Sequence, residues 1–136
     1  MTIASNLPVA PSETASPSSA PRVQLILAGH LTEAALAVGL DRADQEIRAA
    51  KCRAALIVNC LTMTSYDSAA RALFVSWNSR HKSSFLCVAV ITKNMLWHMV
   101  ISSMSLASGQ KMKPFNDLTD AEPWILELWS RQGKSN

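Results

Sequence analysis

The sequence lacks the long apolar segment that a membrane-spanning helix requires. Its longest uncharged stretch, residues 95–110, is interrupted by His98 and several serines and falls short of the roughly 20 apolar residues that cross a bilayer. No basic segment followed by a continuous apolar run stands near the N-terminus, so we expect no secretory signal. These absences predict a cytoplasmic protein without membrane insertion.

Cysteine is scarce, with three in 136 residues and no Cys-x-x-Cys spacing, which argues against a disulfide framework or a zinc site. Cys60 and Cys87 lie within strongly apolar segments, as is typical of reduced, buried thiols. We therefore predict no disulfides and no metal.

The common catalytic and nucleotide-binding signatures are also missing. The chain has no GxGxxG, GxxxxGK(S/T), HExxH or GxSxG segment, so the usual nucleotide, zinc-protease and serine-hydrolase sites are excluded. His30, His81 and His98 are scattered, and nothing in the sequence connects one of them to a carboxylate and a nucleophile. We predict no enzymatic activity, no catalytic residue and no cofactor.

Acidic residues are absent between Asp67 and Asp117, although the chain as a whole carries a net charge of only +3. This span contains the basic residues Arg71, Arg80, Lys82, Lys93, Lys111 and Lys113. A positive surface of this kind attracts an acidic protein, a phosphorylated group or nucleic acid, but it equally describes a set of solvated side chains. Because no RNA-binding aromatic motif or recognition helix is present, we do not expect a nucleic-acid partner.

What the chain does contain is an alternation of apolar and amphipathic segments. Residues 1–21 are rich in Ser and Pro, which predicts a flexible tail, and 131–136 form a flexible C-terminus. Strands are expected at 23–28, 54–61, 85–91 and 111–115, helices at 32–50, 67–81, 94–109 and 119–129, and a loop at 62–66. The alternation predicts one α/β domain over 22–130, with a four- to five-stranded, mostly parallel sheet and about four helices.

Two regions are candidates for function. Residues 62–68 carry several hydroxyl groups at a helix N-terminus, where free N–H groups favour an anion, so Ser68 and Ser65 are candidate phosphorylation sites; ordinary helix capping uses the same residues. In the third helix, Met95, Trp97 and His98 are candidate walls of a ligand pocket because Met side chains adapt to irregular shapes. The same residues also suit a core or a dimer interface.

Four short segments resemble STAS domains, the class of anti-sigma-factor antagonists. Gly29-His30-Leu31-Thr32 is similar to the Gly-x-Leu-Asp/Thr segment after the first core strand of the family, and residues 56–61 resemble its Val-Ile-Leu-Asp-Leu strand. Tyr66-Asp67-Ser68 resembles the apolar-Asp-Ser that starts its second helix, and residues 106–109 resemble the Leu-x-x-Gly that ends its third. The order and spacing match over residues 23–128.

The resemblance implies a divergent SpoIIAA-like fold and a non-enzymatic regulatory module. It implies a regulatory protein partner, kinase-like or anti-sigma-like, that docks on Tyr66, Asp67, Ser68 and Arg71, with Ser68 at the position of the phosphorylatable serine. Ala69 and Ala70 stand where the family has a second Ser and a Gly. A homodimer is also expected, and the alternative function is a small-molecule or lipid-binding domain built on the third helix.

Overall fold

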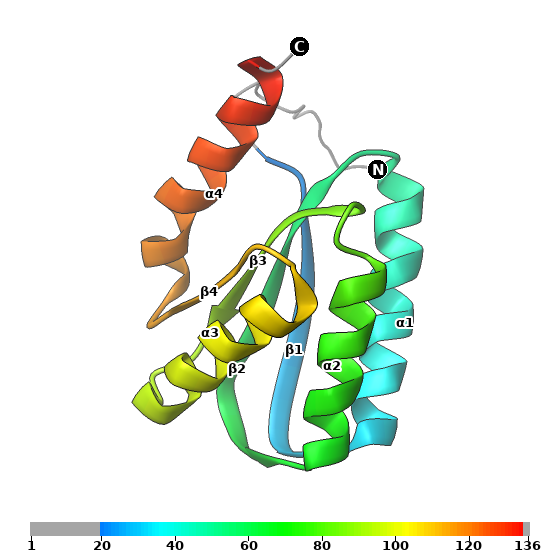
Figure 1. Ribbon diagram of the computed structural model, residues 1–136, viewed down its shortest axis with the longest axis vertical. Coiled ribbons are helices and arrows are strands. Elements are labelled where there is room, and N and C mark those ends of the chain that lie inside the picture. Colours follow the sequence, from blue (N-terminus) through cyan, green and yellow to red (C-terminus); the bar gives the residue numbers. More distant parts are fainter. Residues whose placement is uncertain (1–19, 135–136) are drawn as a thin grey trace, which may run out of the picture.

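Strands and helices alternate along the whole part of the chain that the computed structural model describes, residues 20–134. The elements are β1 (Arg22–Leu31), α1 (Glu33–Ala50), β2 (Ala54–Tyr66), α2 (Ser68–Arg80), β3 (Phe85–Ile91), α3 (Met95–Ser108), β4 (Met112–Phe115) and α4 (Leu118–Lys134) (Figure 1). The four strands form one parallel sheet in the order β1-β2-β3-β4. The predicted α/β class with four strands and four helices is confirmed.

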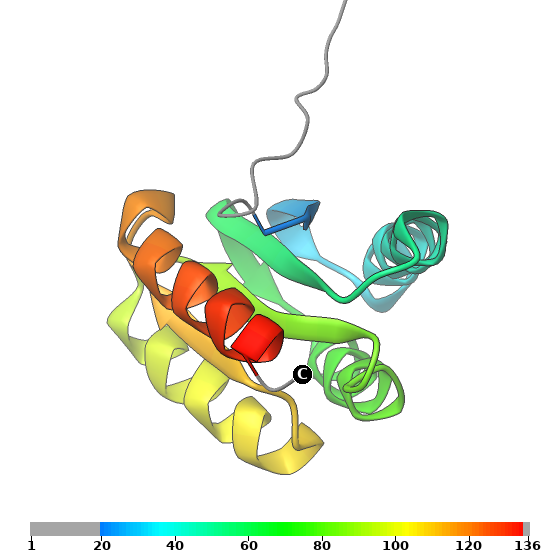
Figure 2. The same ribbon diagram turned by 90° about the horizontal axis from the view of Figure 1, so that it is seen from above.

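The sheet is covered unequally on its two faces. Residues of α1, α2 and α3 share one apolar core with the sheet, whereas α4 packs on the opposite face against β2 and β3 (Figure 2). Every residue of β3 is consequently buried, as expected for a central parallel strand. On β1 buried and exposed residues alternate, and Ile26 is 62% exposed because α4 does not extend over this strand.

Helix ends follow the capping residues that the sequence provides. The Thr32 hydroxyl accepts a hydrogen bond from the Ala35 N–H at 3.1 Å at the start of α1. Before α3, the Asn94 carboxamide oxygen accepts from two backbone N–H groups. Gly109 ends α3 with φ 76°, a left-handed conformation that favours glycine. Asn94 and Gly109 therefore delimit α3 as predicted.

The predicted loop at residues 62–66 is wrong: these residues continue β2. Residues 62–66 pair in parallel with the end of β1, which itself runs to Leu31 rather than stopping at Ala28. The two strands extend beyond β3, whose pairing with β2 ends at Asn59. Side chains on this extension are therefore largely exposed to solvent and need not be apolar. For this reason the polar composition of residues 62–66 did not predict a strand. The predicted docking loop, Ser65 to Ser68, is instead a strand end followed by a helix start.

The described termini differ slightly from the predicted domain limits. Helix α4 continues to Lys134, past the predicted helix end at 129 and the predicted domain limit at 130, so it includes residues 131–134 of the expected flexible C-terminus. Of the expected tail, residues 1–19 lie outside the described residues, while Ala20 is buried in the apolar cluster formed with α4. No helix within the described range is long and apolar enough to cross a membrane.

Candidate functional site: an apolar cleft at the carboxyl ends of the strands

A cleft with a cavity of about 60 Å³ lies among the carboxyl ends of β1, β2 and β3 and the helices α2 and α3. Its walls are almost entirely apolar and include Leu27, Val58 and Val90 from the sheet, with Phe74 and Ile101 from the helices. The cleft is a candidate binding site because it is an apolar cavity with a few polar groups at its edge.

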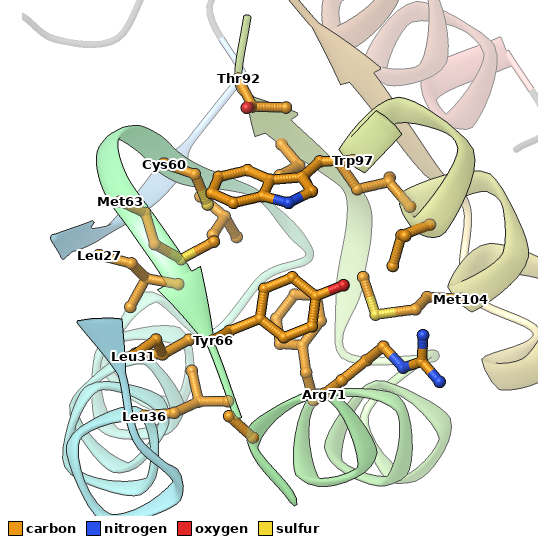
Figure 3. Close-up of a pocket in the computed structure, with 16 residues that line it drawn as sticks. Leu27, Leu31, Leu36, Cys60, Met63, Tyr66, Arg71, Thr92, Trp97 and Met104 are labelled. Carbon is orange, nitrogen blue, oxygen red and sulfur yellow. The ribbon is translucent and has the colours of Figure 1, made fainter. Parts of the chain in front are cut away.

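Two aromatic rings meet across the cleft. Tyr66 is the last residue of β2 and Trp97 lies in the first turn of α3. Their ring centroids are 5.9 Å apart with an interplanar angle of 61°, an edge-to-face contact. The two side chains point toward one another from opposite walls, with Met63 beside them (Figure 3). Separation of these rings would widen the cleft.

The rim of the cleft carries two polar groups, the Arg71 guanidinium group and the Tyr66 hydroxyl. The Arg71 side chain extends from the first turn of α2 and lies beside Met104 (Figure 3). Within residues 20–134, neither its guanidinium group nor the Tyr66 hydroxyl forms an ion pair or hydrogen bond. Arg71 is exposed and stands near the positive end of the α2 dipole. The rim is therefore suited to an anionic group.

Only one of the three ligand residues predicted on α3 reaches this cleft. Trp97 lines it together with Val100 and Met104, whereas Met95 is 66% exposed on the other side of the helix. The His98 imidazole N–H donates to the Thr92 carbonyl oxygen at 2.9 Å and also faces away. With about 100° per residue, positions 97, 100 and 104 share one face and 95 and 98 another. Met95 and His98 instead line a separate surface pocket together with Met99 and Pro114.

The predicted docking residues divide between the two faces of the sheet. Tyr66 and Arg71 line the cleft, whereas Ser65 and Asp67 hydrogen-bond to His30. Successive strand residues point to opposite faces, so Ser65 cannot share the side of Tyr66. Ser65 and Ser68 are exposed. The junction between β2 and α2 is therefore open to solvent.

A cluster that sequence analysis missed joins His30, Ser65 and Asp67. His30 Nδ1 lies 2.6 Å from the Ser65 hydroxyl oxygen, and Nε2 lies 2.8 Å from an Asp67 carboxylate oxygen. Nothing in the sequence connected a histidine to a carboxylate and a nucleophile, but the fold brings His30 to both. Because neighbouring parallel strands end at the same edge, His30 near the end of one strand could have been placed beside Ser65. This pairing was not foreseen because residues 62–66 were predicted to be a loop rather than a strand.

The buried cysteines are not candidate nucleophiles. Burial raises the pKa of Cys60 and of Cys87 to about 12, so both remain protonated at neutral pH. Cys52 is exposed. Within residues 20–134, no three His, Cys, Asp or Glu side chains are grouped as metal ligands. Cys60, which lines the cleft, thus serves there as an apolar surface.

Comparison with known proteins establishes the fold. No family model matches the chain, and no curated protein matches it. A solved structure of an uncharacterized DUF3478-family protein with a SpoIIAA-like fold, from Shewanella loihica PV-4, matches with a TM-score of 0.57. It is 16% identical, over 75% of this chain and 82% of that one. This protein therefore has the α/β architecture of the SpoIIAA-like class, as its resemblance to STAS domains predicted.

Proposed function

We propose that this protein is a binding module whose cleft takes an amphipathic ligand with an apolar chain and an anionic head. The observation that carries the proposal is the position of Arg71, whose guanidinium group has no partner among residues 20–134, at the rim of an apolar cavity. Apolar walls favour the chain, and a guanidinium group favours a carboxylate or phosphate. This role requires no catalysis, in keeping with the expectation from the sequence.

Ligand entry requires the cleft to widen. The cavity of about 60 Å³ is smaller than an alkyl chain of several carbons, so Tyr66 and Trp97 must separate. Met63 and Met104 also line the cavity, and unbranched Met side chains change rotamer readily to fit irregular shapes. Both Met side chains can therefore change conformation to make room for an apolar chain.

Arg71→Gln is expected to weaken binding of octanoate about 5- to 30-fold, as expected for loss of one partly exposed charge-assisted hydrogen bond. Binding of octan-1-ol, which has the same chain without the charge, should be unchanged. Isothermal titration calorimetry of both ligands measures the difference.

Arg80→Gln is the matched control, because Arg80 stands at the other end of α2 and donates to Ser76. It should bind octanoate as the native protein does. If the native protein bound neither ligand, or if Arg71→Gln weakened both equally, the proposed role of the cleft would be wrong.

Docking of a regulatory protein partner at the β2–α2 junction is the second candidate function. It is supported by the exposure of Ser68 at the first position of α2 and by the absence of a side-chain cap from Asp67. A phosphate on Ser68 would place about −1.5 to −2 charges at this helix N-terminus, three residues before Arg71. Phosphorylation would then change the charge of the rim as well as that of the docking surface.

Ser68→Asp, which adds one negative charge, is expected to change the set of proteins retained in a pull-down from cell extract, while Ser68→Ala behaves as the unmodified protein. It should also weaken octanoate binding severalfold, because the new carboxylate competes for Arg71. Identical partner sets and identical octanoate affinities for all three forms would remove Ser68 from the mechanism.

A further inference from the structure

The His30, Ser65 and Asp67 cluster lies on the face of the sheet opposite the cleft, and the proposed binding role does not use it. We infer that it is an acyl-transfer site in which Ser65 is the nucleophile, His30 the general base and Asp67 the group that orients His30. The substrate class is a small, accessible carboxylic ester. This inference departs from the expectation of a protein without catalytic residues and does not depend on the cleft.

Backbone structure places the three groups together. His30 on β1 is the direct register partner of Ser65 on β2, so their side chains project from the same side of the sheet. Asp67 is the N-cap residue of α2, immediately after β2. Each of the three residues thus stands on or beside a regular element, a placement that holds a site more firmly than a long loop does.

An irregularity in the pairing of β1 with β2 lies beside the histidine. Gly29 pairs with Met63 and His30 with Ser65, so the extra residue, Thr64, is on β2, and on β1 Gly29 has φ 62°. This left-handed conformation is available to glycine at little cost. Bulges of this kind re-aim a side chain and are frequent beside active sites. Gly29 therefore has a defined role in turning His30 toward Ser65.

Hydrogen bonding determines which ring nitrogen is the base. An ionised carboxylate only accepts hydrogen bonds, so Asp67 receives the Nε2–H of His30 at 2.8 Å. The lone pair is then on Nδ1, which accepts the Ser65 hydroxyl proton at 2.6 Å. The two nitrogens are exchanged relative to serine proteases, but a carboxylate still orients the base and the base still contacts the nucleophile. The His30 and Asp67 side chains are 52% and 45% exposed, so a substrate can reach them.

The reaction balances without a further cofactor. Nδ1 of His30 takes the hydroxyl proton as Ser65 Oγ attacks the ester carbonyl carbon, and the bond to the leaving alcohol breaks. The imidazolium returns its proton to the departing alkoxide, which leaves an acylated Ser65. Water then gives a proton to Nδ1 and attacks the acyl carbon. The bond from that carbon to Ser65 Oγ breaks, the carboxylic acid leaves, and the imidazolium returns its proton to Oγ.

The test uses p-nitrophenyl acetate with the full chain. We expect the native protein to release p-nitrophenolate about 100-fold faster than Ser65→Ala or His30→Gln, the scale of general-base catalysis, and to carry an acetyl group on Ser65 in peptide mapping. Asp67→Asn should be slowed at least about tenfold. Ser79→Ala, which removes an exposed hydroxyl near the other end of α2, should react at the native rate.

The inference would be overturned if Ser65→Ala released p-nitrophenolate at the native rate, or if the acetyl group were found on lysines or histidines instead of Ser65. Circular dichroism of each variant separates a chemical effect from unfolding. If Ser65→Ala or His30→Gln were unfolded, the Asp67→Asn rate and the site of acetylation in the native protein would decide. Octanoate binding should be the same in native protein and Ser65→Ala, so failure of this inference is distinguishable from failure of the proposed binding function.

Discussion

Val100→Trp is expected to weaken octanoate binding about 5- to 150-fold, the factor that corresponds to an overpacking cost of about 1–3 kcal/mol. Val100 lies on the face of α3 that lines the cleft, and an indole there would occupy a cavity of only about 60 Å³. Because Val100 is only partly buried, the new ring has an outlet toward solvent and the fold should be retained. Isothermal titration calorimetry with octanoate and octan-1-ol gives the affinity, and both ligands should be affected alike.

Leu106→Trp is the matched control for this substitution. Leu106 lies on the same helix, is 88% exposed and does not line the cleft. It should bind octanoate with native affinity and unfold at the native temperature. Equal weakening by both substitutions would mean that the effect arises from α3 as a whole, and native affinity in Val100→Trp would place the ligand outside the cleft.

Phe85→Ala is expected to lower the free energy of unfolding by about 3–5 kcal/mol, the usual cost of deleting a large buried ring. Phe85 begins β3 and has no exposed surface, and its ring centroid lies 5.4 Å from that of Trp77 on α2. Removing the ring leaves a cavity between the central strand and α2 that the rigid sheet cannot close. Urea unfolding monitored by circular dichroism measures the free energy of unfolding. This signal does not depend on Trp77 fluorescence, which the loss of the neighbouring ring would alter.

Phe115→Ala provides the comparison for the core substitution. Phe115 is on the edge strand β4, is only partly buried, and packs against Trp124 with a centroid distance of 5.5 Å. Its loss should cost less than half as much, because solvent and neighbouring side chains refill the space. If Phe85→Ala lowered the free energy of unfolding by no more than Phe115→Ala does, the placement of Phe85 at the centre of the core would be wrong.

Local sequence patterns were sufficient to predict most of the helices and strands. The apolar segment of residues 85–91 corresponds to β3 without change, because a strand buried on both faces needs apolar residues at every position. Asn94 and Gly109 delimited α3 correctly, since side-chain capping and left-handed backbone depend on the residue itself. Such features need no knowledge of distant contacts.

The sequence was not sufficient where the surroundings of a residue depend on a partner strand or on the rotation of a helix. Residues 62–66 are a strand because β1 pairs with them. Their own composition does not predict a strand. Met95 and His98 are outside the cleft because α3 presents residues 97, 100 and 104 to it. Asp67 does not cap α2 with its side chain because His30 binds the carboxylate.

The sequence alone determined the α/β alternation, the buried central strand and the helix ends, because hydrophobic periodicity and capping act over a few residues. Tertiary structure decided which side chains meet. Parallel pairing set His30 beside Ser65, and packing of α3 against α2 placed Trp97 opposite Tyr66. Contacts between residues 35 or 31 positions apart depend on strand register and helix rotation, which are set by burial of the whole core rather than by any local segment.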